Sequence, residues 1–362
     1  MTPNQLSTEG APEQPGPNSE PAGPLRPAGP LTHNRRAPSR RALWFGRGAD
    51  AVVVLLLSGL LIVAGLRRLG TVRPLLLLMF EGMTPYGLSV SIGAGLIAGL
   101  RRRPVALVAA GLTFAVYAAS VWPALGHHSL PPALASTCGA QRLRVAFTNA
   151  YAFNPTPEAA ARTLLAQNAD VVAVAELSGA VAANLDALSG SDYPYRRILG
   201  RMGHNASGLY SRVPFVVEGE ASIVSGVRLR VIHTRTPLGP VGRRVWKEQL
   251  TQLRRDAART SCPMLLVGDF NATRWHLPFG ELLRRARLAD AHEVMGRGLS
   301  RSWPRGTALG LFGPILRLDH ALVNGGLRID RLHDLRVPGS DHVGFVIEVS
   351  PQPPPPRQPR PA

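Results

Sequence analysis

Blocks of apolar residues near the start of the chain predict helices that cross a membrane. Three uncharged apolar segments lie within residues 43–126, with spans expected near 48–66, 83–100 and 104–125. Each approaches the roughly 20 apolar residues that a helix needs to cross a bilayer. The triplet Arg101–Arg103 separates the second segment from the third. We therefore expect about three transmembrane helices in this region.

Other interpretations of these segments stay open. Glu81 interrupts the second apolar region, so we assign Pro74–Phe80 to a lead-in near the membrane interface, and two spans with a re-entrant piece would also fit. A signal peptide is the rival interpretation of the first segment, but a long tail precedes it and no small-x-small cleavage site is present. Buried helices of a soluble protein are less favoured, because the uncharged segments follow one another closely.

Arginines around the spans predict their orientation. The cluster within residues 35–47 and the Arg101–Arg103 loop should lie on the cytoplasmic side of the membrane. An odd number of spans then places the chain after Leu125 outside the cell. Three arginines between residues 67 and 73 weaken the contrast between the two sides. We expect a multi-pass protein of the cell membrane with an extracytoplasmic C-terminal part.

After a linker over residues 127–140, the pattern becomes that of a folded domain over residues 141–350. Apolar runs of strand length alternate there with segments of helical spacing. The expected strands are Leu143–Asn149, Val171–Ala175, Gly208–Arg212, Leu229–Ile232, Met264–Val267, Arg317–Val323 and Val343–Val349. The expected helices are Thr156 to Gln167, Arg243–Arg259 and Phe279–Arg287.

Composition changes this picture only a little. The formal net charge of +18 invites a nucleic-acid partner. Lys247 is the only lysine, however, and the joint abundance of Arg, Ala, Gly and Pro resembles a coding bias as much as a binding surface. Residues 1–42 and the Pro-rich residues 351–362 have no periodic apolar pattern, so we expect them to be disordered.

Candidate chemistry begins in the stretch Met264–Thr273, MLLVGDFNAT. Asp269 and Asn271 follow a predicted buried strand, and their spacing of two places both on one side of an extended segment. A Gly-Asp turn with Asn271 as its local hydrogen-bond partner would account for the same residues. The same pattern, a polar residue at the end of a predicted strand, recurs across the domain. The residues concerned are Asn149, Glu176, His233, Asp269 with Asn271, Asp319, and Asp341 with His342. Carboxylates suit a hard divalent cation, histidines suit proton transfer or phosphate contact, and amides orient oxygens.

The segments FTNAY, VVAVAEL, GLYSR, VIHTRTP, LLVGDFNAT, RLDH and GSDHVGF resemble, in this order, the motifs of the endonuclease/exonuclease/phosphatase superfamily, which includes deoxyribonuclease I. The resemblance covers roughly residues 141–350, and GDFN with a C-terminal SDH is its most specific part. It implies an α/β fold, the four-layer α/β sandwich in which two β-sheets pack face to face with helices outside.

The resemblance also implies a role for each polar strand end. Glu176 would bind Mg²⁺, or alternatively Mn²⁺, with Asn149 and Asp341 close by. Asp319 would orient His342, which acts as general base or phosphate contact, and Asp269 would orient or deprotonate the attacking water. Asn271 and His233 would contact the phosphate. Whether Asp269 or His342 takes the proton stays open.

Some positions depart from the pattern or stay unassigned. Ala150 and Tyr151 follow Asn149, where some nuclease members carry a carboxylate two residues after the asparagine, so a second metal ligand is in doubt, as is assignment to the abasic-site nuclease branch. No acid partner for His233 is evident. We interpret His320 as structural, and four further histidines as surface or structural residues: His204, His276, His292 and His333.

The expected function is a membrane-anchored, divalent-metal-dependent phosphodiesterase or nuclease. A lipid- or sugar-headgroup phosphodiesterase or phosphatase, and a non-catalytic binding protein with the same fold, are the alternatives. The expected partners are the membrane and a phosphate-ester substrate, which nucleic acid would satisfy, and no protein partner can be inferred. The only two cysteines, Cys138 and Cys262, precede two strands, and a disulfide and two free thiols both fit this placement.

Overall fold

The computed structural model describes residues 40–66, 74–126, 128–134, 138–306 and 313–353. The chain divides into a unit over Met1–Gly46 and a unit over Arg47–Ala362. Apart from the start of the first helix, every element belongs to the second unit. The tails expected to be disordered lie almost entirely outside the described residues, as do the arginines between residues 67 and 73.

Four helices precede the α/β domain, and they are α1 (Arg40–Leu66), α2 (Leu75–Gly82), α3 (Thr84–Leu100) and α4 (Pro104–Leu125). Helices α3 and α4 pack closely because Gly87 has no side chain. A Cβ atom there would lie 2.2 Å from the Tyr117 ring on α4. The Tyr117 hydroxyl also donates a hydrogen bond to the Leu60 carbonyl of α1 at 3.1 Å.

These helices differ from the expected three spans. Among the described residues, α4 is the one helix that is long and apolar enough to cross a membrane, or one of two if the bent pair α2 and α3 counts as a single span. The two helices of this pair meet at 75°. Pro85, which cannot donate a backbone hydrogen bond, lies in the first turn of α3 and ends α2. The expected lead-in over Pro74–Phe80 is mostly the separate helix α2, and the apolar segment found in α1 within the described residues is Val53–Leu66.

The first sheet has the strand order β11-β12-β1-β2-β4-β3. Its strands are β1 (Leu143–Asn149), β2 (Val171–Ala175), β3 (Tyr195–Leu199), β4 (Ser207–Ser211), β11 (Leu327–Arg336) and β12 (Val343–Pro351). β1 and β2 pair in parallel, so Asn149 and Glu176 follow at the same sheet edge.

The second sheet has the strand order β5-β6-β7-β8-β10-β9. Its strands are β5 (Phe215–Glu218), β6 (Ala221–Val224), β7 (Val227–His233), β8 (Met264–Asp269), β9 (Ala289–Asp290) and β10 (Asp319–Val323). β7 and β8 are its parallel pair, while β10 runs antiparallel to β8.

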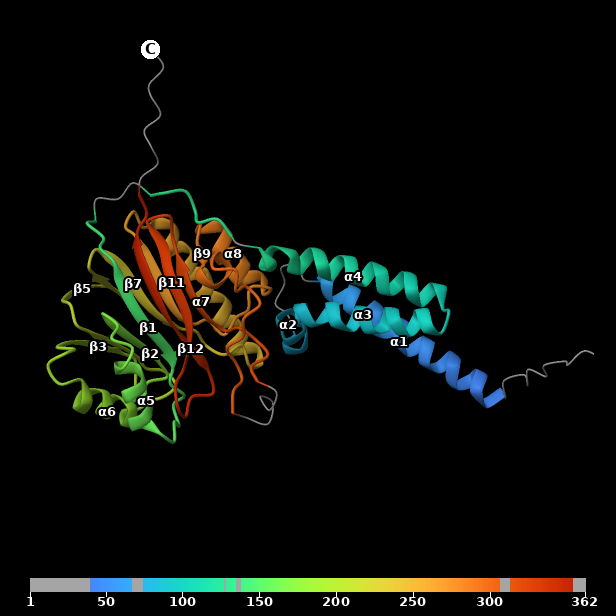
Figure 1. Cartoon of the computed structure of the whole chain (residues 1–362), viewed down its shortest axis with the longest axis horizontal. Coiled ribbons are helices and arrows are strands. Elements are labelled where there is room, and N and C mark those ends of the chain that lie inside the picture. The colour runs from blue at the N-terminus through green and yellow to red at the C-terminus, as the bar shows by residue number, and fades with distance from the viewer. Residues whose placement is uncertain (1–39, 67–73, 127, 135–137, 307–312, 354–362) are drawn as a thin grey trace, which may run out of the picture. The chain divides into compact units, whose positions relative to one another are not determined.

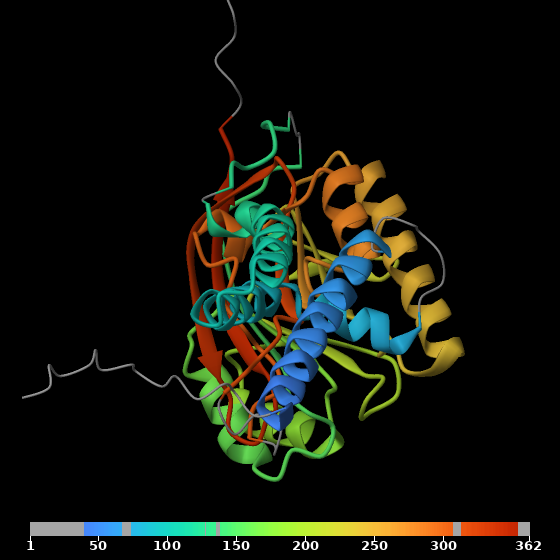
Figure 2. The same ribbon diagram turned by 90° about the vertical axis from the view of Figure 1, so that its right-hand side faces the viewer.

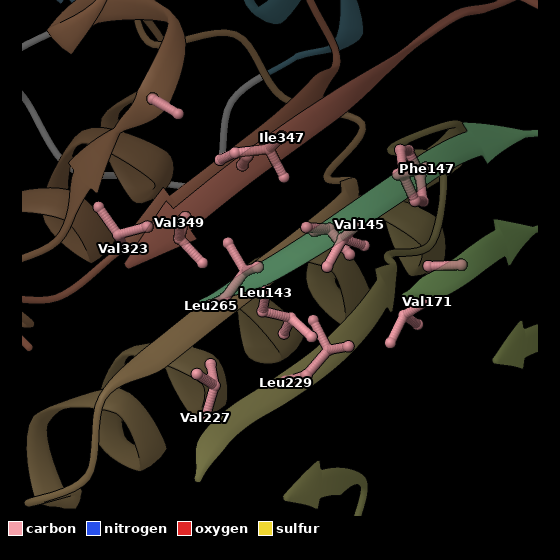
Figure 3. Close-up of a cluster of buried hydrophobic side chains, with 14 of the residues drawn as sticks. Leu143, Val145, Phe147, Val171, Val227, Leu229, Leu265, Val323, Ile347 and Val349 are labelled. Atoms are coloured by element: carbon pink, nitrogen blue, oxygen red, sulfur yellow. The ribbon is translucent and has the colours of Figure 1, made fainter. Parts of the chain in front are cut away.

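The two sheets pack face to face around a core of aliphatic and aromatic side chains from both (Figure 3). In β1, Leu143, Val145 and Phe147 point into this core, whereas Ala146 points to the outer helices, as the alternation of a strand requires. Each fully buried side chain of this kind contributes about 1.5–3 kcal/mol of transfer free energy.

Helices cover the outer faces of both sheets (Figure 1). α5 (Pro157–Leu165) and α6 (Gly179–Ser189) cover the first sheet, and α7 (Gly239–Arg259) and α8 (Leu277–Arg285) cover the second. A one-turn helix, α9 (Ala291–Val294), follows β9. The order helix, sheet, sheet, helix confirms the predicted four-layer α/β sandwich.

A disulfide joins Cys138 to Cys262, with the two Cα atoms 5.7 Å apart. It connects the segment before β1 to the segment before β8 and so ties the two sheets together. Of the two alternatives that the sequence leaves open for these cysteines, the structure contains the bridge. Its sequence separation of 124 residues closes a long loop, which constrains the unfolded chain.

Candidate active site

The polar strand ends of both sheets meet at one edge of the sandwich. The register of the second sheet accounts for part of this gathering, because Asp269 pairs with His233 on one side and with Asp319 on the other. Three chemically active side chains therefore stand in a row across β7, β8 and β10. His233 and Asp319 are 86 residues apart in the sequence, and strand pairing alone brings them close together in space.

His342, just before β12 in the first sheet, faces this row. Its Nδ1 atom lies 2.7 Å from Asp319 Oδ2, and its Nε2 atom lies 3.9 Å from Asp269 Oδ2. Burial disfavours the charged imidazole, but Asp319 and then Asp269 outweigh it and raise the pKa of His342 to about 10. The imidazole therefore carries a proton at neutral pH. The predicted role of Asp319 as the partner of His342 matches this geometry.

Glu176 is the second centre of the site. It follows β2 with a φ of 49°, in the left-handed region, which turns its side chain toward the other sheet. One carboxylate oxygen lies 3.5 Å from His233 Nε2, and the other accepts the backbone N–H of Ala152 at 3.1 Å. Burial opposes ionisation, but hydrogen bonds from His233, Asn149 and Ala152 lower the pKa of Glu176 to about 2. Glu176 is thus the acid partner of His233 that the sequence did not reveal.

Asn149 bridges the two sheets. Its amide nitrogen donates to Glu176 Oε1 at 3.2 Å and to Asp269 Oδ2 at 3.1 Å. Its amide oxygen accepts the backbone N–H of Tyr151 at 3.0 Å. In this arrangement Asn149 fixes the positions of the two carboxylates.

Asn271 occupies the turn after β8 with a φ of 45°. Its backbone N–H donates to Asp269 Oδ1 at 2.8 Å, and its side chain donates to the Thr234 carbonyl at 2.9 Å. The local turn considered for the GDFN stretch therefore exists, and it holds Asp269 within the site. The pKa of Asp269 is raised by burial and by Asp319, against the lowering effect of His342.

Asp341 lies at the rim, where its side chain is 23% exposed. One oxygen accepts the indole N–H of Trp303 at 3.1 Å, and the other lies 4.0 Å from His342 Nε2. Asp341, one of the predicted metal ligands, thus adjoins the site at His342.

Two clusters of described residues have the donors of a metal site, with the ligand atoms of each within 4.8 Å of one another. They are Glu176, His233 and Asp269, and Asp269, Asp319 and His342. The carboxylates suit a hard divalent cation. Among the described residues, the buried Asp319 Oδ1 atom has no hydrogen-bond partner, so this donor set has spare capacity for a cation. Asp341 belongs to neither cluster.

One contact at the site was missed from the sequence. His204, expected to be a surface or structural residue, places Nδ1 2.9 Å from Glu176 Oε2, and its ring packs edge-on against Phe153 with centroids 5.1 Å apart. The histidine lies in an irregular loop before β4, where no apolar period points to it. Its position next to Glu176 exists only in the folded chain.

The remaining histidines fit their structural assignment. His320 is buried, with Nδ1 2.6 Å from Asp290 and Nε2 2.9 Å from the Ala272 carbonyl, so it supports the turn after Asp269. His276 is buried and its Nε2 atom lies 3.0 Å from the Leu78 carbonyl of α2. His292 is buried against Asp290 and Arg317, and His333 lies exposed on β11.

Several solved structures are similar to this chain. An endonuclease/exonuclease/phosphatase from Beutenbergia cavernae DSM 12333 is 20% identical, with coverage of 60% of this chain and 73% of that chain and a TM-score of 0.45. D. rerio TDP2 complexed with single strand DNA product is 15% identical, with coverage of 58% and 99% and a TM-score of 0.47. The 3′-5′ exonuclease NExo from Neisseria meningitidis is 18% identical, with coverage of 58% and 99% and a TM-score of 0.44.

No curated protein matches the sequence. A family model does match, over residues 146–342, which is more than half of the 362-residue chain. The match begins within β1 and ends at His342, so it spans every polar residue gathered at the site. Together with the two packed sheets, it shows that the chain belongs to the endonuclease/exonuclease/phosphatase family.

Proposed function

We propose that this protein is a membrane-anchored, divalent-metal-dependent phosphodiesterase. The observation that carries the proposal is the sharing of Asp269 between two clusters, one with Glu176 and His233 and the other with Asp319 and His342. The family acts on phosphate esters, and the clustered carboxylates and imidazoles are the groups that such hydrolysis needs.

Mg²⁺, with Mn²⁺ as the alternative, is the proposed cofactor. Glu176 would hold it, and Asn149 and Asp341 would complete its surroundings. When bound, the cation neutralises charge on the phosphate and on the departing oxygen. The depressed pKa of Glu176, about 2, keeps this carboxylate ionised and ready to hold a cation at any physiological pH.

The protein's own residues divide the remaining work. His342, kept protonated by Asp319, donates a hydrogen bond to a phosphate oxygen. Asp269, which Asn149 and Asn271 hold in place, orients the attacking water and takes its proton. Asn271 and His233 contact the phosphate as it passes through its transition state. This division makes Asp269 the base and His342 the phosphate contact.

Two substrate classes fit the proposal. Nucleic acid is favoured by the family's nuclease members and by the excess of arginine. A lipid or sugar headgroup is favoured by the apolar helices, whose large side chains are exposed at several positions, including Leu96, Val105 and Trp122. An anchor of this kind would hold the catalytic domain beside a membrane.

We further propose that the catalytic domain faces the exterior of the cell. The arginine distribution around the helices supports this orientation. The Cys138–Cys262 disulfide supports it independently, since disulfides persist in oxidising compartments.

The test is hydrolysis by the full-length protein in a mild detergent. The substrates are single-stranded DNA, RNA, a glycerophosphodiester and bis(p-nitrophenyl) phosphate, each with Mg²⁺ or with EDTA. We expect hydrolysis only with the cation, and a loss of at least about a hundredfold in His342→Ala and Asp269→Asn. His333→Ala, at an exposed histidine of β11, is the matched control and should keep full turnover. Activity that survives EDTA and both substitutions would contradict the proposal.

A further inference from the structure

A cavity of about 770 Å³ lies away from the catalytic residues, between α7, α8 and α2. Figure 2 views this face, with α2 next to the long helix α7. None of the catalytic or metal-binding candidates lines it. Its wall contains apolar side chains, basic side chains, two acids and three neutral polar residues, and the apolar and basic groups together suit an amphiphile.

The apolar part of the wall comes from three helices. Leu78 of α2, Trp246 of α7 and Leu277 of α8 line it. Leu78 is packed into the core beneath α7 and α8, which fixes α2 at the cavity. The other side of α2 exposes Leu76, Met79 and Phe80, with 66%, 59% and 45% of their surfaces accessible. A short helix with such an exposed apolar face is suited to lie in a membrane interface.

The basic part of the wall comes from α7. Arg243, Lys247, Thr251 and Arg255 follow one another at steps of four residues, so they share one face of the helix. Arg243 and Arg255 bring positive charge to this face, which an anionic group in the cavity would complement.

The two acids that line the cavity, Glu248 and Glu281, pair with arginines other than Arg243 and Arg255. Glu248 lies 3.9 Å from Arg244, and Glu281 lies 3.9 Å from Arg254 and 3.4 Å from Arg285. Arg243, by contrast, has a buried Nε atom with no hydrogen-bond partner in the part of the chain that the structure describes. A buried guanidinium donor without an acceptor is costly, so it marks the place where an anionic group would bind.

We propose that this cavity binds an acidic phospholipid of the membrane, with its phosphate against Arg243 and Arg255 and its glycerol and acyl chains against Leu78 and Leu277. The proposal rests on the membrane anchoring proposed above but not on the hydrolytic activity. The basic face gives electrostatic selectivity for an anionic headgroup, and the apolar wall beside an interfacial helix favours a lipid over a free anion.

The bound lipid would touch the wall that supports the catalytic turn. The indole N–H of Trp246 donates to the carbonyl of Phe270 at 3.0 Å, between Asp269 and Asn271. The bound phospholipid would thus have a structural role close to the catalytic site and would not be a substrate in it.

The experiment is native mass spectrometry of the full-length protein in an uncharged detergent, titrated with dioctanoyl phosphatidylglycerol or dioctanoyl phosphatidylcholine. We expect phosphatidylglycerol to bind at least about tenfold more tightly, since one charge-assisted hydrogen bond is enough for that difference. The double variant Arg243→Gln with Arg255→Gln should bind the two lipids equally. Arg255→Glu, a single change at an exposed position, should also weaken the binding of phosphatidylglycerol.

Two controls separate lipid binding in the cavity from a general effect of surface charge and from capture of a substrate in the catalytic site. Arg259→Gln with Arg331→Gln removes the same charge at exposed positions outside the cavity and should leave selectivity intact. Asp269→Asn, inactive in hydrolysis, should bind phosphatidylglycerol like the natural protein. Equal binding of both lipids to the natural protein, loss of selectivity in either control, or inorganic phosphate binding as tightly as phosphatidylglycerol would overturn the proposal.

Discussion

Asp319 and His342 form a buried pair, with Asp319 Oδ2 2.7 Å from His342 Nδ1. The pair joins the second sheet to the first, since Asp319 begins β10 and His342 directly precedes β12. The hydrogen bond from Nδ1 fixes the ring so that Nε2 points toward Asp269. The contact that raises the pKa of His342 is therefore the same contact that aims its other nitrogen into the site.

Asp319→Asn should remove the charge that holds this proton while keeping the shape of the side chain. We expect turnover to fall about a hundredfold or more, and the pKa of His342 to fall from about 10 toward the ordinary range. The imidazole resonances of His342, followed by NMR between pH 5 and 10, would report the shift directly. A variant with normal turnover would show that Asp319 has only a structural role.

Salt dependence should identify the substrate class. If the substrate is nucleic acid, arginines of the domain that neutralise its phosphates displace counterions from the nucleic acid, so affinity should fall steeply between about 50 and 200 mM salt. The measurement is KM for single-stranded DNA across that range, with bis(p-nitrophenyl) phosphate as the control substrate. A flat dependence for DNA would favour a small headgroup substrate instead.

Glu293 should make stability depend on pH. Burial and the nearby Asp290 raise its pKa from 4.5 to about 7, although Arg274 opposes the shift. Between these two values the folded chain binds more protons than the unfolded chain, so the free energy of unfolding should decrease as pH rises from about 4.5 to 7. The total is on the order of 2–3 kcal/mol. Glu293→Gln should flatten this dependence in thermal unfolding experiments, whereas the exposed Glu158→Gln should not.

The disulfide should be detectable without its reduction. Alkylation of the unreduced, denatured protein should leave both Cys138 and Cys262 unmodified, and reduction before alkylation should add two labels. Replacing both cysteines by serine should destabilise the domain by about 2–5 kcal/mol, because the unfolded chain gains the freedom of a long loop. Two labels on the unreduced protein would rule out the bridge.

Sidedness should be visible in fusions made after Ala140. An exterior catalytic domain predicts an active alkaline phosphatase fusion and a dark green fluorescent protein fusion at the same site. The opposite pair of results would place the domain in the cytoplasm and favour an intracellular nuclease. The orientation depends on whether α2 and α3, bent at 75°, cross the membrane as one span.

Much of the site could be predicted from single residues, because strand ends carry their own signal. Asp269 and His233 each follow a short apolar run, and parallel pairing brings them to one edge whatever the loops do. His204 gave no such signal, since its contact with Glu176 depends on the path of an irregular loop. The left-handed backbone conformation of Glu176 could not be predicted from the sequence either, because the fold imposes it.

For the helices before the domain, the sequence separates residues 74–80 from residues 83–100, but it does not give the 75° angle between α2 and α3. A continuous transmembrane helix and two apolar helices that meet at an angle give the same hydropathy profile along the sequence. Pro85 was visible in the sequence, but the contact of Leu78 with the core beneath α7, which holds α2 in place, was not.

The bridge made by Asn149 has a consequence for how activity arises. This residue belongs to one sheet and donates to Asp269 on the other at 3.1 Å, so the catalytic carboxylates acquire their positions only when the two sheets have docked. Neither sheet alone brings together the residues of the proposed catalytic site. If the proposed activity and the proposed exterior orientation hold, a chain still crossing a membrane would be inert toward any phosphodiester it met, and hydrolysis would begin as an all-or-none event at the completion of folding.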